Sequence, residues 1–495
     1  MQNQRDYIRL ILGLKIKQLR IEKNLSLNDL AEKSGLSVSY LNEIEKGKKY
    51  PKAEKIAQLA ESLGVSYDNL VSLKLTKNLS PIQDLIDSNI LELLPLDHYG
   101  IDLNKFISLM SDASSQLSAL VATVIEMAKS TELSQNNFSR TALRLYKEIN
   151  ENYFEDIETA VEKFITDFNL DVSPPINLNS LIDILKEKYN YVIDENRISE
   201  FDELKDLRAV LKPSKQPKLF LNPKLATSQK LFILGKELAY NYLNISKRSF
   251  IHSSLKLNTF DHLLNNYNAA YFSTALIINK KFFIDDINDF FKKDKFSETS
   301  LINFINKYEI TPEMFFQRLA NLAGKVWGLN KHFFLRFNTF AGADKYDLTK
   351  EIRLNIKQNP GGFQTNENYC RRWLSIELLQ KLKKDLNGFD SHGKMISGIL
   401  HSKFHETEDE YLTFSIAQQN ILIPNTFTSI TIGFYLDEHL KKTINFWNDE
   451  NIPFRIVNDT CEMCNLNDCQ ERIAEPTSLW TIQRSKNIEE AIKNL

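Results

Sequence analysis

The sequence lacks the features that mark a secreted or a membrane protein. No run of about 18 uncharged apolar residues occurs among the 495 residues, so we predict no membrane-spanning helix. The N-terminal stretch MQNQRDYIRLILGLKIKQLR places charges among its apolar positions, unlike a signal peptide. Only four cysteines occur, and three of them lie within nine positions near the end of the chain, which argues against a disulfide scaffold. We therefore expect a cytoplasmic protein without a membrane partner.

A strong overall charge is also missing, because the formal net charge is −2. The charge is nevertheless uneven. Residues 1–77 hold 14 lysines and arginines against 9 aspartates and glutamates, whereas the remainder holds 48 against 55. Nucleic acid is therefore expected to bind at the basic N-terminal end. The length and the 42% hydrophobic content predict about two to four domains.

Residues 8–74 divide into short amphipathic segments. Ser26 and Ser37 stand where helix N-caps are expected, and Gly35 and Gly47 stand where helices end. The two helices joined by KSGLS have the size of a helix-turn-helix, whose second helix fits the major groove of DNA. The segments KAEKIAQLAESLGV and SYDNLVSL complete a predicted five-helix bundle.

The stretch LNDLAEKSGLSVSYLNEIEKGKKYPKAEKIAQLAESLGV resembles the lambda-repressor-like, XRE-type DNA-binding domain. It carries the pattern L-A-x-x-x-G-x-S-x-x-Y-L-x-x-I-E-x-G-x-x-x-P. The resemblance implies that five side chains face bases or flanking phosphates: Ser37, Ser39, Tyr40, Asn42 and Glu43. It implies that four lysines lie near the DNA backbone: Lys46, Lys48, Lys49 and Lys55. It also implies a structural pair between Arg20 and Glu45. A helical bundle that does not bind DNA is the alternative.

Glycine and proline are nearly absent between Tyr99 and Val172, and the pattern there is helical. We predict a helical linker or dimerisation region over residues 78–172, following the DNA-binding domain of residues 1–77. Helices after a single DNA-reading head commonly hold two heads at a fixed spacing. Alternatively, they are core helices of the next domain.

A new unit is predicted over residues 173–328, after a double proline. The segment LRAVLKPSKQPKLFLNP predicts two short strands, and LFILGKELAYNYL predicts a helix. This order resembles the ImmA/IrrE-type metallopeptidase domain, with its zincin-like α+β fold. The family's metal-site positions fall here on Lys236, Glu237, Tyr240 and Asn268.

A catalytic zinc site needs two imidazoles at positions i and i+4, a third ligand and a general base. Of that set only Glu237 is present. The resemblance therefore implies a degenerate pseudo-peptidase domain, and we expect neither enzymatic activity nor a catalytic cofactor. An unrelated amphipathic helix is the alternative.

The remaining residues, 329–495, contain strand-like runs such as HFFLRFNTF and SITIGFYL, and predict a C-terminal α+β sensor domain. Cys370 lies in YCRRW, and Cys461, Cys464 and Cys469 lie in CEMCNLNDC. Four thiolates can form a tetrahedral structural zinc site. A redox pair and ordinary reduced cysteines are the alternatives.

Taken together, the pieces predict a multidomain chain, mainly α with α+β parts. In this order they resemble the short-chain fatty acyl-CoA regulator (RamB-like) family. That resemblance implies a transcriptional regulator that binds a double-stranded DNA operator as a homodimer or higher homo-oligomer under control of a short-chain acyl-CoA. Two alternatives are a metallopeptidase acting on a repressor and an antitoxin-like or phage-type repressor controlled by a partner protein.

Overall fold

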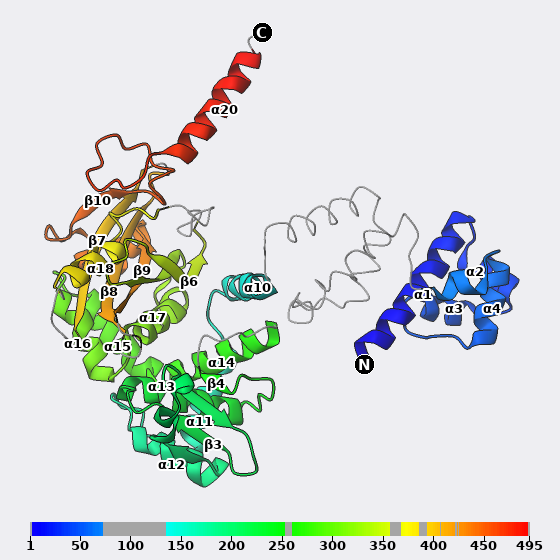
Figure 1. Cartoon of the computed structure of the whole chain (residues 1–495), viewed down its shortest axis with the longest axis horizontal. Coiled ribbons are helices and arrows are strands. Elements are labelled where there is room, and N and C mark those ends of the chain that lie inside the picture. Colours follow the sequence, from blue (N-terminus) through cyan, green and yellow to red (C-terminus); the bar gives the residue numbers. More distant parts are fainter. Residues whose placement is uncertain are drawn as a thin grey trace. The chain divides into compact units, whose positions relative to one another are not determined.

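The computed structural model describes residues 2–72, 135–252, 260–356, 368–385, 394–405, 407–420, 423 and 425–493. The chain divides into two compact units, which Figure 1 colours along the sequence. The first comprises Met1–Ala142 with Asn258–Asp261, and the second comprises Leu143–Leu257 with His262–Leu495. The predicted linker of residues 78–172 lies outside the described residues as far as residue 134.

The N-terminal part of the first unit is the predicted five-helix bundle. Its helices are α1 (Gln2–Glu22), α2 (Leu27–Ser34), α3 (Val38–Glu45), α4 (Ala53–Ser62) and α5 (Tyr67–Val71). The predicted helix boundaries are confirmed. Ser26 caps α2 in a capping box with Asp29, Ser37 caps α3, and Gly35 ends α2 with a left-handed φ of 65°.

Close packing between α1 and α3 depends on a glycine. A Cβ atom added at Gly13 would lie 2.3 Å from the carbonyl oxygen of Ile44, closer than real Cβ contacts. At the other side of the bundle, the Lys15 ammonium donates to the carbonyl oxygens of Asn69 and Ser72 at 2.8 and 2.6 Å. These bonds tie α1 to α5 and complete the bundle.

The second unit contains a small four-stranded sheet with the order β1-β3-β2-β4. The two short strands predicted from LRAVLKPSKQPKLFLNP are confirmed as β2 and β3, which pair antiparallel. The elements of this part, from α10 to the start of the large sheet, are α10 (Gln135–Ile149), α11 (Glu155–Asp167), α12 (Leu178–Tyr189), β1 (Val192–Asp194), the 3-10 turns Arg197–Glu200 and Asp202–Leu204, β2 (Ala209–Lys212), β3 (Lys218–Leu221), α13 (Thr227–Tyr242), β4 (Ile251–His252), α14 (Phe260–Ile277), α15 (Lys280–Phe291), α16 (Glu298–Tyr308) and α17 (Pro312–Trp327).

A six-stranded sheet with the order β10-β7-β8-β9-β5-β6 follows. All neighbours pair antiparallel except β10 and β7, which are parallel. The elements are β5 (His332–Phe340), β6 (Asp347–Leu354), α18 (Leu374–Asp385), β7 (Met395–Phe404), β8 (Glu410–Gln419), β9 (Thr426–Tyr435), α19 (Glu438–Thr443), the 3-10 turn Asn445–Asn448, β10 (Phe454–Val457) and α20 (Thr477–Lys493).

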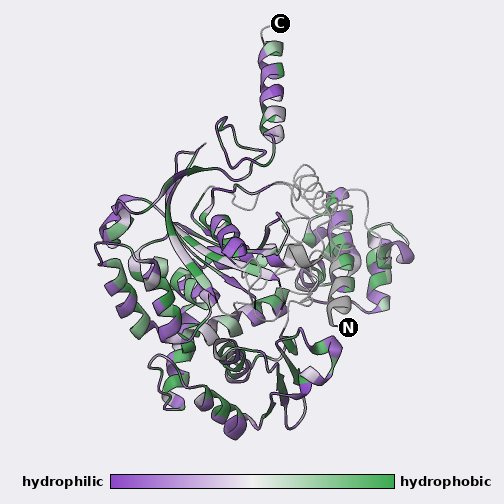
Figure 2. Cartoon of the chain, turned by 60° about the vertical axis from the view of Figure 1, so that its left-hand side comes forward, coloured by the Kyte–Doolittle hydropathy of each residue, from purple (hydrophilic) through white to green (hydrophobic). Residues whose placement is uncertain are grey.

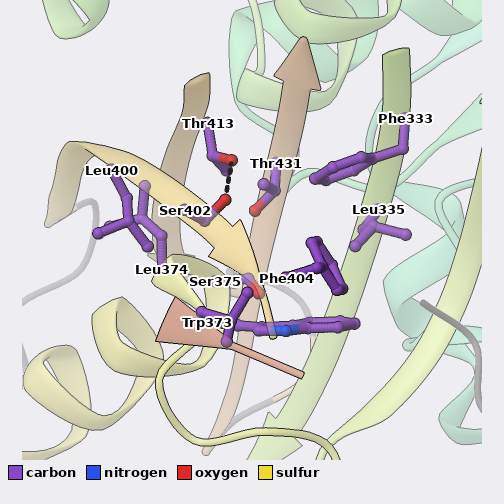
Figure 3. Close-up of a pocket in the computed structure, with 11 residues that line it drawn as sticks. Phe333, Leu335, Trp373, Leu374, Ser375, Leu400, Ser402, Phe404, Thr413 and Thr431 are labelled. Atoms are coloured by element: carbon purple, nitrogen blue, oxygen red, sulfur yellow. Dashed lines mark hydrogen bonds between the residues drawn. The ribbon is translucent and has the colours of Figure 1, made fainter. Parts of the chain in front are cut away.

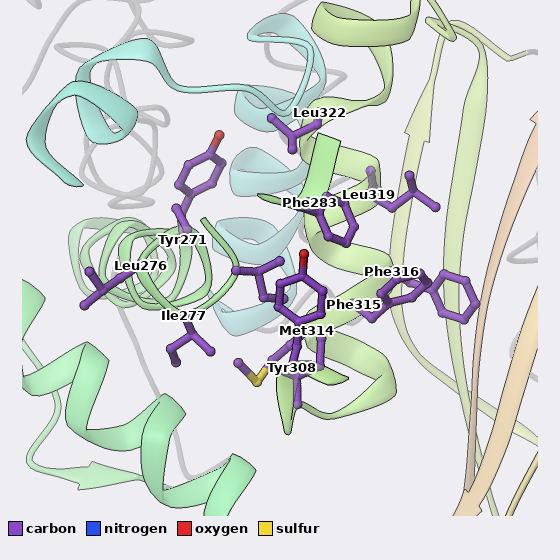
Figure 4. Close-up of a cluster of buried hydrophobic side chains, with 14 of the residues drawn as sticks. Tyr271, Leu276, Ile277, Phe283, Tyr308, Met314, Phe315, Phe316, Leu319 and Leu322 are labelled. Carbon is purple, nitrogen blue, oxygen red and sulfur yellow. The ribbon is translucent and has the colours of Figure 1, made fainter. Parts of the chain in front are cut away.

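The two faces of this sheet bury different partners, because successive side chains of a strand point to opposite faces. On β5, Phe333 and Leu335 belong to a cluster with Trp373 and α18. Phe334 belongs to a larger cluster that includes Phe315 and other residues of α17. Figure 4 shows side chains of α17 packed near those of α14 and α15. The residues of this single cluster come from positions between Phe154 and Phe446, so it includes side chains from both sides of the predicted boundary at 328.

A fully buried ion pair joins two helices inside this core. The guanidinium of Arg318 on α17 pairs with the carboxylate of Glu158 on α11, and each side chain is 1% exposed. Arg318 Nε also donates to the carbonyl oxygen of Ile278 at 3.0 Å, and Tyr271 donates to Glu158 Oε1 at 2.9 Å. Because all these polar groups are bonded, the core tolerates the two charges.

The last helix, α20, extends away from the large sheet (Figure 1). Polar and apolar residues are mixed along its length (Figure 2), and Trp480 and Ile488 on it are exposed. Among the described residues, no helix is long and apolar enough to cross a membrane.

Candidate functional site

The exposed face of α3 is the first candidate site. Leu41 and Ile44 are fully buried in the bundle and fix the rotation of this helix. Ser37 and Ser39 are exposed at its start, and Asn42 is half-buried on its outer side. A helix held in this way offers polar side chains with hydrogen-bonding groups to a groove of DNA.

Tyr40 is held by two of the predicted lysines. The Lys55 ammonium lies 4.4 Å from the centre of the Tyr40 ring, and that of Lys49 lies 5.8 Å from it. Lys49 also forms an ion pair with Glu43 at 2.7 Å, which raises the pKa of Lys49. The loop after α3 and the start of α4 therefore gather cations beside Tyr40 of α3, where phosphates can attract them.

Lys46 and Lys48 are exposed in the same loop. The nine predicted DNA-contacting residues thus lie on α3, on the loop that follows it and at the start of α4. The predicted pair of Arg20 and Glu45 is also present, with both side chains largely buried, so these two residues support the helix from inside.

The residues predicted to occupy degenerate metal-site positions form a second candidate site. Lys236 and Tyr240 lie one turn apart on α13, and both reach the same acceptor on α14: Asn266 Oδ1 accepts from Lys236 Nζ at 2.6 Å and from the Tyr240 hydroxyl at 3.3 Å. Asn266 stands two positions before Asn268, the residue predicted from the sequence. The cluster is therefore an ammonium, a phenol and an amide, which do not form a zinc ligand set.

Glu237, the next residue of α13 after Lys236, is fully buried. It forms an ion pair with Arg248 and accepts a hydrogen bond from the Tyr191 hydroxyl at 3.0 Å. The Arg248 guanidinium also lies 3.8 Å from the centre of the Tyr240 ring. Both carboxylate oxygens of Glu237 are therefore hydrogen-bonded.

Burial changes the acidity of this cluster. It lowers the pKa of Lys236 to about 8, although Glu237 acts in the opposite direction. It raises the pKa of Tyr191 to about 12, and the nearby charge of Glu237 adds to that effect. Lys236 is therefore a cation that burial destabilises, and an anion beside it would be favourable.

The cysteines form a third candidate site. The backbone of Tyr369 pairs with that of Thr460, and the Cys461 N–H donates to the carbonyl oxygen of Asn368 at 2.8 Å. Cys370 consequently lies near Cys461 and Cys464. Burial raises the pKa of the Cys370 thiol to about 12, and the two neighbouring cysteines add a smaller effect in the same direction. Cys469 is the most exposed of the four.

Backbone groups near two of these sulfur atoms oppose the effect of burial on the thiol pKa. Backbone N–H groups of Asn458 and Arg372 point to Cys370, and those of Ile473 and Ala474 point to Cys461. Among the described residues, however, no three ligating side chains are arranged so that they could hold a metal ion. As described, the cysteines therefore do not form a complete metal site, and only the nearness of Cys370 to Cys461 and Cys464 supports one.

Arg472 fixes the loop that carries the three clustered cysteines. Its guanidinium donates to the carbonyl oxygens of Cys461, Cys464 and Leu466 at 3.1, 3.0 and 2.7 Å. Arg472 lies three positions after Cys469 and is therefore part of the cysteine motif in the sequence. Its hydrogen bonds to the loop carbonyl oxygens, however, could be seen only in the structure.

A small cavity lies between α18 and the sheet, lined by Phe333, Trp373 and Phe404 (Figure 3). Its volume is about 20 Å³, which holds a single water molecule. Ser402 and Thr413 place their hydroxyl oxygens 3.4 Å apart in it. This space is a packing gap rather than a ligand site.

Two residues of the second candidate site were not evident from the sequence. Arg248 lies in a polar loop segment that looks like ordinary surface, and Asn266 carries no motif. Arg248 lies in the loop that joins α13 to β4, and the path of this loop brings it to Glu237. The local sequence pattern does not predict that path.

Comparison with known proteins bears on the N-terminal bundle. A family profile described as Helix-turn-helix matches residues 16–70. An uncharacterized HTH-type transcriptional regulator, y4dJ of Sinorhizobium fredii, is 35% identical over 65 residues, which are 13% of this chain and 84% of that protein. The HTH-type transcriptional repressor RghR of Bacillus subtilis is 40% identical over 60 residues, which are 12% of this chain and 44% of that protein.

One solved structure is similar over a larger part of the chain. It is a Mycobacterium tuberculosis transcriptional regulator with 13% identity and a TM-score of 0.47, covering 68% of this chain and 93% of that one.

Proposed function

This chain belongs to the helix-turn-helix transcriptional regulators of the XRE family, and we propose that it binds a specific operator under the control of a small metabolite. The observation that carries the proposal is the placement of α3. One side of this helix is buried in the bundle, whereas Ser39, Tyr40 and Asn42 are exposed or half-buried and can reach a groove of DNA. The cations of the loop after α3 supply the attraction to phosphates.

A regulator with one such head reads a two-fold symmetric operator as a dimer. We therefore propose a cytoplasmic homodimer, in which residues 143–495 sense the metabolite. A coupling of about 1–3 kcal/mol between the two sites would change operator occupancy about 5- to 150-fold. The resemblance to acyl-CoA regulators makes a short-chain acyl-CoA the first candidate effector.

We further propose that the pseudo-peptidase part has no enzymatic activity. Lys236 and Tyr240 occupy the two positions where imidazoles would bind zinc, and Glu237 is held by Arg248. The cysteines are proposed to hold a structural zinc ion, supported by the nearness of Cys370 to Cys461 and Cys464.

The test is a mobility-shift experiment with the full-length protein and the DNA upstream of its own gene, at physiological salt. A discrete shift that one acyl-CoA alters supports both the DNA binding and the effector. A shift that no acyl-CoA changes retains DNA binding and excludes acyl-CoA control. No shift with this DNA or with a library of random duplexes contradicts the function.

A further inference from the structure

A large cavity in the second unit lies beside Lys236. Its volume is about 360 Å³, within the range of about 300–1,000 Å³ that small-molecule sites occupy. It lies on the face of the large sheet that packs against α17, opposite the small cavity of Figure 3. Its walls come from α13 and α14 on one side and from β5, β6, β8 and β9 on the other.

The charges around this cavity are strongly unequal. Four cationic side chains line it, namely Arg208, Lys236, Arg336 and Lys350. Among the described lining residues, Glu313 carries the one carboxylate. The walls therefore have an excess of three positive charges, in a place where burial already destabilises a cation.

Glu313 compensates only part of this charge. Its carboxylate pairs with Lys350 at 3.1 Å and with Arg336 at 3.2 Å. Burial alone would raise the pKa of Glu313, but these two cations lower it to about 2. Glu313 is thus ionised at every physiological pH and acts as an internal counter-ion.

Arg208 and Lys236 are compensated less directly: Glu313 acts on Arg208 and Glu237 acts on Lys236, but neither cation is in direct contact with a carboxylate. Within the described part of the chain, the Arg208 guanidinium is in no direct hydrogen bond or ion pair; burial lowers its pKa, and the nearby charge of Glu313 acts in the opposite direction. Lys236 is bonded to the neutral amide of Asn266. A half-buried and a buried cation that have no direct contact with a carboxylate are costly to a fold, unless they serve a ligand.

Two further groups point to a missing partner. Arg336 Nε and Gln419 Oε1 are buried on the cavity wall, and neither has a hydrogen-bond partner among the described residues. The rest of the lining is apolar and includes Phe232, Met314 and Ile430. A ligand with a charged end and a small apolar part would contact both kinds of surface.

We propose that this cavity binds a small organic anion that carries at least two negative charges, as phosphate or carboxylate groups. The assignment rests on the proposed function, because it supplies the site for the controlling metabolite. Arg208 and Lys236 hold the anion directly. Glu313 competes with it for Arg336 and Lys350, so the ligand binds across the gap between α13 and strands β5 and β6.

The first test is isothermal titration calorimetry of the full-length protein with coenzyme A, ADP and citrate at physiological salt, with sodium sulfate as the ionic control. Binding of both coenzyme A and ADP would identify a diphosphate as the recognised group, whereas binding of citrate alone would identify carboxylates. We expect at least one of the three to bind, and failure of all three overturns the inference.

Variants then locate the site. Arg208→Met and Lys236→Met are each expected to weaken binding at least about 10-fold, because each removes a charge-assisted contact. Glu313→Gln is expected to tighten binding, since it removes the competing carboxylate. Lys215→Met, on the exposed turn between β2 and β3, is the matched control and should bind as the unmodified protein does.

Thermal unfolding separates a binding role from a structural one. Without ligand, Arg208→Met should raise the melting temperature, because it removes a half-buried positive charge that lies among other cations and has no direct ion pair. With ligand, the variant should lose the increase that the unmodified protein shows. Variants that bind the probe as the unmodified protein does, or a Glu313→Gln change that weakens binding, would contradict the assignment.

The outcomes distinguish this site from the proposed control of DNA binding. If an anion binds here and the operator shift ignores it, the site exists and the metabolite control is wrong. If an acyl-CoA alters the operator shift equally in Arg208→Met and in the unmodified protein, the control exists and this cavity is not its site.

Discussion

Arg20 on α1 and Glu45 on α3 form a two-bonded ion pair beneath the recognition helix. Arg20 Nε donates to Glu45 Oε1 at 2.7 Å, and Nη2 donates to Oε2 at 3.0 Å. Arg20 also donates to the carbonyl oxygen of Leu25 at 2.9 Å, in the turn before α2. One side chain therefore fixes α3, α1 and the start of the helix-turn-helix relative to one another.

Breaking this pair should destabilise the bundle. Arg20→Met alone leaves the largely buried carboxylate of Glu45 without its partner and should lower the free energy of unfolding by about 2–3 kcal/mol. The double change Arg20→Met with Glu45→Leu should recover much of that loss. Chemical denaturation measures all three proteins, and equal stability of the single and double variants would argue against the pair.

Recognition of bases should depend on the outer face of α3. Ser39→Ala combined with Asn42→Ala should weaken binding to the operator about 10- to 100-fold while leaving non-specific DNA binding intact. Neither side chain belongs to the buried core of the bundle, so the fold should persist. Gln58→Ala, exposed on α4, is the control in a mobility-shift assay. Unchanged operator affinity of the double variant would exclude α3 as the recognition helix.

The loop lysines should act through salt. Lys48→Ala should weaken binding to all DNA sequences alike, and should reduce by about 1 the slope of log affinity against log salt concentration. A loss restricted to the operator would instead assign Lys48 to base recognition. Fluorescence anisotropy over a range of salt concentrations measures both quantities.

Glu237 is expected to matter for stability and not for hydrolysis. Glu237→Gln leaves the buried guanidinium of Arg248 without its charge partner and should cost about 3 kcal/mol of unfolding free energy. Glu195→Gln breaks the more exposed pair with Lys230 and should cost less than about 1 kcal/mol. Zinc-dependent cleavage of casein that Glu237→Gln abolishes would overturn the pseudo-peptidase proposal.

His332 should make the second unit sensitive to mild acid. It is fully buried at the start of β5, and burial lowers its pKa to about 4 from the ordinary value of 6.5. The unfolded chain therefore binds a proton below pH 6.5 that the folded chain does not bind until about pH 4, so stability falls as the pH falls through this window.

Between pH 7 and pH 5 this group should reduce the unfolding free energy by about 2 kcal/mol. The His332→Gln variant should lack that part of the decrease, and His405→Gln, at the end of β7, should retain it. Denaturation curves at the two pH values decide the matter. An identical decrease in His332→Gln and in the unmodified protein would refute the assignment.

The cysteine site predicts a bound metal. The purified chain should contain about one zinc ion, and Cys461→Ser with Cys464→Ser should remove it and lower the melting temperature. Met463→Leu, between the two cysteines, should retain the metal. Iron with inorganic sulfide in place of zinc would show that the thiols hold an iron–sulfur cluster, and a metal-free, fully stable chain would exclude both.

The sequence alone determined the N-terminal domain. Its helix caps, glycine ends and apolar spacing are local signals, and each agrees with the bundle that forms, from Ser26 at the start of α2 to Gly35 at its end. Helices and strands of the second unit, such as α13 and β5, also follow from local patterns. Apolar residues that recur with a period of about 3.6 indicate a helix, and those that recur with a period of 2 or form a short apolar run indicate a strand.

Tertiary structure decided which of those elements share a site. Lys236 looked like a lost zinc ligand, and only the packing of α13 against α14 places it beside Asn266, with Arg208, Arg336 and Lys350 around the same cavity. Likewise, a backbone bridge between Tyr369 and Thr460 brings Cys370 to the other cysteines. These groups are far apart in the chain, and their meeting depends on sheet order and helix packing, which no local pattern encodes.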